Sequence, residues 1–314
     1  MTCIAVFSNV AGIGNTTLVY HLGHMLADMG QRIVLVDLDP QASLTSLCLP
    51  EERIEALWQG EPDLHPTIVM VPEAGFHLET LLPGLALVPG DPSLATKDDT
   101  LATSWSDGVL PKNGRIPITS HLALWLSATQ ENHPADFMLL DLGPNLGAIN
   151  RAALLAADYL LTPLAPSLQS IAGLQVLGSE FNRWSAQWQP LNAEVQYHPE
   201  FPKLLGYVVT QTGMRLANPV PSYARWLARL PGAYRQAFQQ HGGGYPASPA
   251  SDPECLGLIH HYAGLMPLAL DARKPMFALR PADGAIGSHM DSVQRCREDY
   301  ERLANQILTR TADG

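Results

Sequence analysis

Lysine is the residue type that this 314-residue chain most clearly lacks. Only four of its 19 basic residues are lysine, and none of the four precedes Lys97. The formal net charge is −11 at pH 7. Tight, sequence-independent binding to nucleic acid depends on neutralising phosphates, so the overall charge argues against it. A local patch of arginines is the remaining route to DNA.

Cysteine and long apolar runs are also sparse. The four cysteines (Cys3, Cys48, Cys255 and Cys296) form no C-x-x-C pair, so we expect free thiols and no disulfide framework or zinc motif. No run approaches the roughly 20 apolar residues of a membrane helix. The first residues also lack the basic segment of a signal peptide. The sequence therefore predicts a cytoplasmic globular protein that does not attach to membranes.

The N-terminal residues have the pattern of a βαβ unit. Residues 3–8 form a short apolar run typical of a buried parallel strand. A glycine-bearing loop follows, and residues 16–29 carry apolar side chains at helical spacing up to Gly30, which is placed to end the helix. Residues 33–36 are a second apolar run. Units of this kind build a parallel sheet.

Further apolar runs predict the rest of a three-layer α/β fold, with a mostly parallel twisted sheet and helices on both faces. We expect one domain over residues 1–314, with insertions near 50–130 and 183–260. The segment 241–254 is rich in Gly, Pro and Ser and predicts a mobile surface loop. Residues 288–309 predict an amphipathic C-terminal helix. The expected strands are 85–88, 137–142, 159–163 and 206–210.

The segment Val10-Ala11-Gly12-Ile13-Gly14-Asn15-Thr16-Thr17 has the context of a phosphate-binding loop, between a strand and a helix. Glycines let successive backbone N–H groups turn toward phosphate oxygens, and the helix N-terminus adds its positive end. A hydroxyl at the Thr16 position commonly ligates Mg²⁺. A plain glycine turn without a ligand is the alternative for this loop alone.

Two acidic segments follow apolar runs. Asp37 and Asp39 leave the second predicted strand, and Asp141 ends the run at residues 137–142. Two carboxylates at i and i+2 that leave a strand, as Asp37 and Asp39 do, can face the same side. A turn that merely ends a strand is the alternative for the Asp39-Pro40 step.

Together these segments resemble the deviant-Walker P-loop ATPases of the ParA/Soj/MinD family. The loop resembles the family's K-G-G-x-G-K-T-T, residues 37–41 its D-x-D-P-Q segment, and residues 139–147 its Walker B strand and second switch. The resemblance implies ATP or ADP and Mg²⁺ as cofactors, with metal-side roles for Thr16, Asp39 and Asp141 and a catalytic role for Asp39 in orienting water. Residues 11–17 would hold phosphates, and Thr210 and Arg215 would lie near the adenine.

The chain departs from this pattern where the family carries positive charge. Val10 and Asn15 replace its two loop lysines, and Ala11 replaces a glycine. Asn cannot neutralise phosphate charge, and a cation supplied across a dimer is worth about 10³–10⁵ in rate in related systems. We therefore expect weakened nucleotide binding and slow or absent hydrolysis. Arg151 is one candidate to replace the missing cation, although an exposed position or an ion pair with Asp158 is the simpler interpretation.

Two functions follow from the resemblance. The first is a ParA-like, nucleotide-dependent dimeric switch that positions DNA or another large cargo with a ParB-like or adaptor partner. The second is a pseudo-ATPase that acts as a scaffold for another protein. Arg295, Arg297 and Arg302 on the last helix, with Arg310, Arg225 and Arg229, are candidate DNA contacts and would place the protein on the nucleoid. Acidic residues are interleaved with those of the last helix, so a solvated helix face is the alternative.

Other site types fit the sequence less well. The electron-transferring iron proteins share this fold but need cysteines near residues 141–147, where this chain has none. The histidine pairs His21/His24 and His260/His261 lack further ligands at metal-binding spacing, so we expect structural roles for them.

Overall fold

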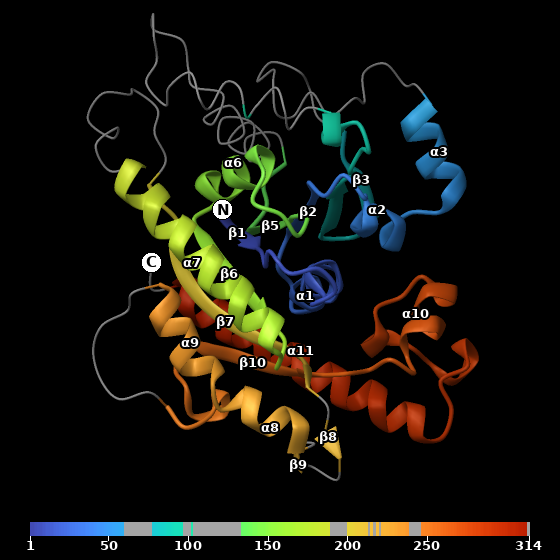
Figure 1. The fold of residues 1–314 in the computed structure, drawn as a ribbon. Coiled ribbons are helices and arrows are strands. Elements are labelled where there is room, and N and C mark those ends of the chain that lie inside the picture. The colour runs from blue at the N-terminus through green and yellow to red at the C-terminus, as the bar shows by residue number, and fades with distance from the viewer. Residues whose placement is uncertain are drawn as a thin grey trace, which may run out of the picture.

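The computed structural model describes residues 1–59, 77–96, 102, 133–188, 200–212, 214–215, 218–219, 221–238 and 246–312. These residues form an eight-stranded sheet in the order β10-β7-β6-β1-β5-β2-β4-β3 and a two-stranded ribbon, β8-β9 (Figure 1). Neighbouring strands of the large sheet are parallel except for β3 and β4. The strands are β1 Thr2–Val6, β2 Ile33–Asp37, β3 Glu79–Leu82, β4 Leu85–Val88, β5 Phe137–Asp141, β6 Tyr159–Leu164, β7 Lys203–Thr212, β8 Met214–Arg215, β9 Asn218–Pro219 and β10 Cys255–His260.

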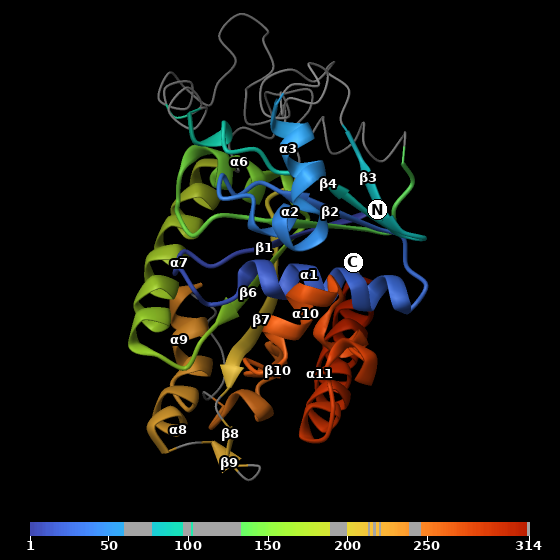
Figure 2. The ribbon, with the colours of Figure 1, turned by 90° about the vertical axis from the view of Figure 1, so that its right-hand side faces the viewer.

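Helices cover both faces of the sheet (Figure 2). Successive residues of β1 alternate between two cores: Ala5 packs with α6, α7 and α9 on one face, and Ile4 with α1, α10 and α11 on the other. The three-layer fold predicted from the sequence is therefore confirmed. The helices are α1 Asn15–Asp28, α2 Ser43–Cys48, α3 Glu51–Gln59, α6 Ala148–Ala156, α7 Leu168–Trp188, α8 Pro221–Leu227, α9 Leu230–Ala237, α10 Met266–Ala272 and α11 Ser288–Ala312, with short 3₁₀ turns η3 Pro249–Ser251, η4 Met276–Ala278 and η5 Pro281–Asp283.

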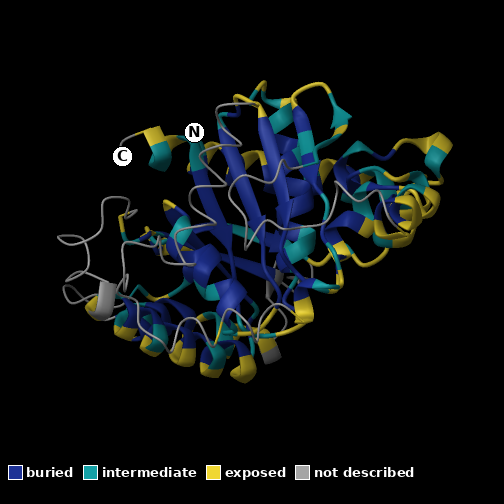
Figure 3. Cartoon of the chain, turned by 90° about the horizontal axis from the view of Figure 1, so that it is seen from above, coloured by how far each residue is buried: buried dark blue, intermediate teal, exposed yellow. Residues whose placement is uncertain are grey.

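The buried strands and half-exposed helices follow the apolar pattern of the sequence (Figure 3). Helix α1 ends as expected, with Gly30 in the left-handed region at φ 87°. Helix α11 is amphipathic, and its buried stripe includes Cys296, Tyr300 and Leu303. Strand β7 is longer than the expected 206–210, and α6 begins three residues before Arg151.

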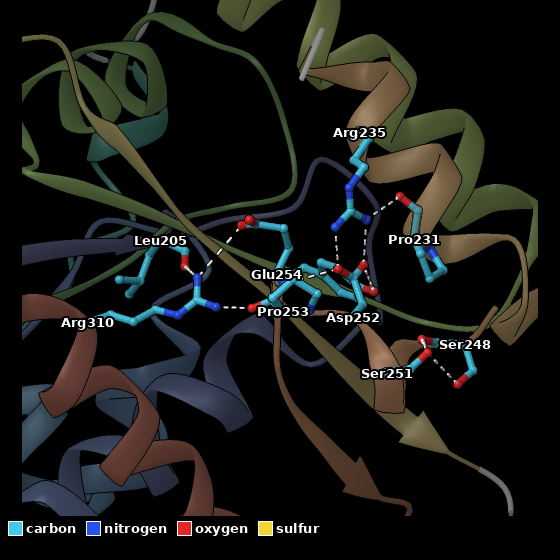
Figure 4. Close-up of polar contacts among 10 residues, drawn as sticks. Leu205, Pro231, Arg235, Ser248, Ser251, Asp252, Pro253, Glu254 and Arg310 are labelled. Carbon is cyan, nitrogen blue, oxygen red and sulfur yellow. Dashed lines mark hydrogen bonds and ion pairs between the residues drawn. The ribbon is translucent and has the colours of Figure 1, made fainter. Parts of the chain in front are cut away.

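The segment expected to be a mobile surface loop, residues 241–254, lies only partly within the described residues. Residues 239–245 lie outside them. In residues 246–254, Ala247, Ala250, Ser251 and Pro253 are exposed, while Pro249 and Asp252 are buried. The Asp252 carboxylate accepts hydrogen bonds from the Arg235 guanidinium at 2.9 and 2.6 Å and from the Tyr207 hydroxyl at 2.8 Å (Figure 4).

The carboxyl ends of the parallel strands meet at one edge of the sheet. The loop after β1 lies there, because β1 pairs with β5 on one side and β6 on the other. The turns after β2 and β5 flank this loop. This is the edge at which open parallel α/β sheets bind ligands. The single-domain organisation with two insertions stays a prediction, since residues 60–76, 103–132 and 189–199 lie outside the described part.

Candidate nucleotide-binding site

The loop between β1 and α1 has the backbone form of a phosphate cradle. Gly12 and Gly14 adopt φ 75° and 99°, which only glycine reaches without strain. No side chain caps α1, and its first intrahelical hydrogen bond runs from Leu18 N–H to Gly14 O, so the preceding N–H groups have no partner within the helix. A cleft of about 570 Å³ opens over residues 10–17. This geometry fits an anion at a helix N-terminus.

The two positions without lysine are occupied by contacts inside the chain. A Cβ on Gly173 of α7 would lie 2.2 Å from Val10 Cγ2, so Val10 packs directly against that glycine. Asn15 turns back on the loop, and its Nδ2 donates to Ser8 O at 3.1 Å. Its Oδ1 is buried without a hydrogen-bond donor among the described residues. Neither side chain brings positive charge to the cleft.

Three carboxylates lie beside the loop without a basic residue among the described residues that line the cleft. Asp141 is fully buried, and neither of its oxygens receives a hydrogen bond of normal geometry from the described residues. The pKa of Asp141 is raised well above its usual range. Burial is the largest cause, the negative charge of Asp37 adds to it, and the Thr16 hydroxyl acts to lower the pKa. Asp39, 9% exposed, lines the cleft and accepts a hydrogen bond from Gln41 N–H at 3.0 Å.

These residues fit a magnesium ion that is bound together with phosphates. Within the described part of the chain, no group of three or more His, Cys, Asp or Glu side chains forms a metal cage. Mg²⁺ usually takes one or two carboxylates and completes its shell with phosphates and water. The unpartnered Asp141 oxygens and the adjacent Thr16 hydroxyl supply such an incomplete set, and a bound cation would offset the cost of the buried charge.

Asp37, already noted as a carboxylate that leaves β2, and Asn150, which the sequence analysis did not assign, fix the turns that flank the cleft. Asp37 accepts hydrogen bonds from Thr45 N–H at 2.8 Å and Thr45 Oγ1 at 2.6 Å, and burial raises its pKa to about 6. Asn150 donates to Gly143 O at 2.6 Å and to Asn145 O at 2.8 Å. Asp37 therefore holds the turn that follows β2, and Asn150 holds the turn that follows β5.

A second, mostly apolar pocket of about 490 Å³ adjoins the phosphate cleft. Ile13, Gly14 and Thr17 line both. Thr210, expected near the base, lines the pocket and donates its hydroxyl to Ile13 O at 2.8 Å. Arg215 belongs to β8, but its side chain lies outside the described part. A phosphate in the glycine cradle would therefore place an attached nucleoside in this pocket.

The far wall of the apolar pocket was missed by the sequence analysis because its residues carry no motif. It consists of side chains from the end of β10, from α10, from η4 and from α11: Ile259, His260, His261, Tyr262, Ala263, Met266, Pro267, Leu270, Met276 and Tyr300. The adjacent histidines at 260–261 were the one visible signal, and they were interpreted as structural.

His21 connects this wall to the phosphate loop. Its Nδ1–H donates to Thr17 O at 2.8 Å, and its Nε2 accepts from Met276 N–H at 3.0 Å. Burial, the largest cause, lowers the pKa of His21 to about 4. Its ring stacks on Tyr300 at 5.1 Å. The structural role predicted for His21 fits this neutral, doubly bonded imidazole.

The candidate cations lie elsewhere. The Arg151 guanidinium lies 5.1 Å from the Trp184 ring centroid and does not line the cleft, so a role at the phosphates would require its side chain to move. On α11, Arg297 pairs with Asp28 at 3.1 Å and Arg302 with Asp299 at 2.6 Å, while Arg295 donates to Ser292 Oγ at 3.4 Å. The structure therefore does not bring Arg295, Arg297 and Arg302 to the nucleotide site, and their predicted contact with DNA stays a prediction.

The fold and the loop define a P-loop nucleotide-binding α/β protein. Residues 1–196 match the family model described as "AAA domain". The chain is 28% identical over 193 residues to the chromosome partitioning protein ParA of Caulobacter vibrioides, covering 60% of this chain and 64% of that protein. The chain thus spans under two thirds of the length of the curated relatives that it matches first.

Solved structures show the same fold along nearly the whole chain. McdA of Cyanothece, solved as a variant in complex with ATP, aligns with a TM-score of 0.66 at 18% identity and covers 98% of this chain and 96% of its own. The pNOB8 ParA bound to nonspecific DNA aligns with a TM-score of 0.63 at 14% identity and covers 99% of each chain. The protein belongs to the ParA/Soj/MinD-like P-loop ATPase family.

No helix among the described residues combines the length and apolar character that a membrane span requires.

Proposed function

We propose that this protein is a ParA-like positioning switch that binds a magnesium–nucleotide complex and hydrolyses ATP slowly. One observation carries the proposal: a glycine phosphate cradle continues into an apolar pocket, while the described residues that line the cleft supply one carboxylate, Asp39, and no lysine or arginine. The cradle supports binding, and the missing charge supports slow chemistry, because a transferring phosphoryl group needs positive charge around it.

A binding titration followed by a turnover assay tests the proposal. Gly14→Val should abolish binding, because φ 99° strains any side chain and the new atoms fill the cradle. Gly30→Val is the matched control: Gly30 has φ 87° with open space around its Cβ position, but it lies at the far end of α1. Wild-type protein that binds neither ADP nor ATP with Mg²⁺ would overturn the proposal.

The switch would act as a homodimer with a ParB-like or adaptor partner, and DNA is its proposed cargo or surface. The pNOB8 ParA, which shares this fold, was solved on nonspecific DNA. Arg295, Arg297 and Arg302 would have to give up their present partners to reach phosphates. A salt-dependent DNA shift that is unchanged when all three are replaced by glutamine would remove them from the DNA surface.

The pseudo-ATPase is the second candidate, and the packing of the loop favours it. Val10 against Gly173 and Asn15 against Ser8 give both altered positions a structural use. This candidate would be supported if the wild-type protein binds nucleotide and forms a dimer but shows no measurable ATP turnover. Arg151→Ala tests the replacement cation: if it leaves both binding and turnover unchanged, Arg151 does not replace the missing charge.

A further inference from the structure

Asp299 of α11 organises a hydrogen-bond network at the wall of the apolar pocket. It is 3% exposed. Its Oδ2 accepts from His260 Nδ1–H at 2.7 Å, from His260 N–H at 3.1 Å and from the Tyr262 hydroxyl at 2.6 Å. Its Oδ1 accepts from the Arg302 guanidinium at 2.6 Å. Burial acts to raise the pKa of Asp299, but the hydrogen bonds from His260 and Tyr262 outweigh it and lower the pKa.

This network determines which nitrogen of His260 is available. A carboxylate that binds Nδ1–H fixes the imidazole tautomer and its orientation. In the neutral ring, Nε2 is then a hydrogen-bond acceptor. His260 lines the pocket, and its side chain is 31% exposed. The ring is therefore fixed in orientation and still accessible to a ligand.

Two other polar side chains of the same pocket are already engaged. The Thr210 hydroxyl donates to Ile13 O at 2.8 Å, and the Tyr262 hydroxyl donates to Asp299. Around them the lining is mostly apolar, with Ile259, Met266 and Leu270 among its members. Pockets for small molecules are typically apolar, with a few fixed polar groups that determine specificity. His260 has the fixed orientation that such a group needs.

We propose that His260 is the residue that reads the base in this pocket, with Nε2 accepting a hydrogen bond from an exocyclic amino group of a purine. Asp299 is the positioning residue that holds the imidazole in the accepting tautomer. The inference rests on the proposed nucleotide function and adds its specificity: an adenine-type base is selected over a purine with an oxygen or a hydrogen at the same position. A keto oxygen would meet Nε2 as a second acceptor, and neither group could donate.

The test compares three ligands at fixed Mg²⁺ in the complete wild-type chain: ADP, IDP and purine riboside 5′-diphosphate. A site that loses one buried hydrogen bond typically loses on the order of tenfold in affinity. We therefore expect ADP to bind about tenfold more tightly than either analogue. Equal affinities for all three would overturn the role of His260 and leave the proposed function standing. Absence of binding by all three would instead contradict the proposed function.

Variants then assign the preference to the residue. His260→Phe keeps an aromatic ring but removes the acceptor, so ADP should weaken to the level of the analogues while their affinities stay the same. His289→Phe is the matched control, since His289 lies on α11 outside the lining of this pocket and should leave the ADP preference intact. Asp299→Asn should reduce the preference without altering how the analogues bind. A wild-type preference that survives His260→Phe would contradict the assignment.

Discussion

The two halves of the nucleotide site are built differently. On the phosphate side, the glycine cradle is intact, but Val10 and Asn15 turn toward Gly173 and Ser8, and Asp141 receives no hydrogen bond of normal geometry from the described residues. On the base side, His21 and Asp299 have their main polar groups paired. The backbone of both sides therefore has the form that a nucleotide site needs. The charged groups are paired on the base side, whereas the carboxylates of the phosphate side have no lysine or arginine among the described residues that line the cleft.

This difference shows which part of a phosphate loop depends on its side chains. The turn of the loop needs only glycines with positive φ, and the helix start needs only its backbone N–H groups. Neutralisation of the phosphates needs a charged side chain, and this loop offers none. Binding and hydrolysis can therefore separate in such a protein.

The largest expected effect is on stability, in the segment that leads into β10 and the wall of the base pocket. The Arg235–Asp252 pair holds the segment that leads into β10, and its side chains are 11% and 0% exposed. Arg235→Leu leaves a buried carboxylate unpaired and should lower the free energy of unfolding by about 3–5 kcal/mol. Arg32→Leu, in an exposed pair with Asp136, should cost less than about 1 kcal/mol. Chemical denaturation measures both, and equal losses would show that the buried pair does not support this side.

A second change restores charge to the phosphate side. The double variant Val10→Lys/Asn15→Lys should raise ATP turnover by about 10²-fold or more, because both missing cations return. Val10→Leu/Asn15→Gln is the neutral control and should leave turnover as it is. If the lysine variant binds ATP but turns over no faster than the control, the lost charge is not what limits hydrolysis.

A third change disturbs the packing under the phosphate loop. In Gly173→Ala, the new Cβ would lie 2.2 Å from Val10 Cγ2 and 3.0 Å from Asn9 Oδ1. Overpacking of this kind costs about 1–3 kcal/mol, even though alanine favours a helix. Gly264→Ala, whose nearest neighbour would be His289 Nε2 at 3.8 Å, should change stability by less than about 0.5 kcal/mol. If the Gly173→Ala protein has wild-type stability, Val10 and Asn9 can move away from the new Cβ without a cost in folding free energy.

The last effect is the pH dependence of stability that His21 contributes. Its folded-state pKa is about 4, against about 6.5 for an ordinary histidine, so between these values only the unfolded chain takes up a proton. Its contribution to stability is complete above pH 6.5 and is lost as pH falls toward 4, with a slope of at most about 1.4 kcal/mol per pH unit. The raised pKa of Asp37 acts in the opposite direction, so the measurement is the difference between wild type and His21→Asn. Parallel stability curves over this range would contradict a buried neutral His21.

Much of the fold was predictable from the sequence because it depends on local patterns. The apolar runs predicted strands β1, β2, β5 and β6, and the glycines predicted the loop and the end of α1. The base pocket was not predictable, because its wall joins Thr17 to residues near 260, 276 and 300, which only tertiary packing brings together. The burial of Asp252 was missed for the same reason: its partner Arg235 lies 17 residues away in another element.

The central claim is that the base side is complete and the phosphate side lacks positive charge, and the affinities of ADP and ATP test it most directly. Calorimetric titration of the wild-type chain with each nucleotide and Mg²⁺ should give dissociation constants within about threefold of each other, because the described residues that line the cleft include no lysine or arginine for the third phosphate. In Asn15→Lys, ATP should gain about tenfold over ADP. Wild-type protein that already binds ATP tenfold or more tightly than ADP would contradict the account.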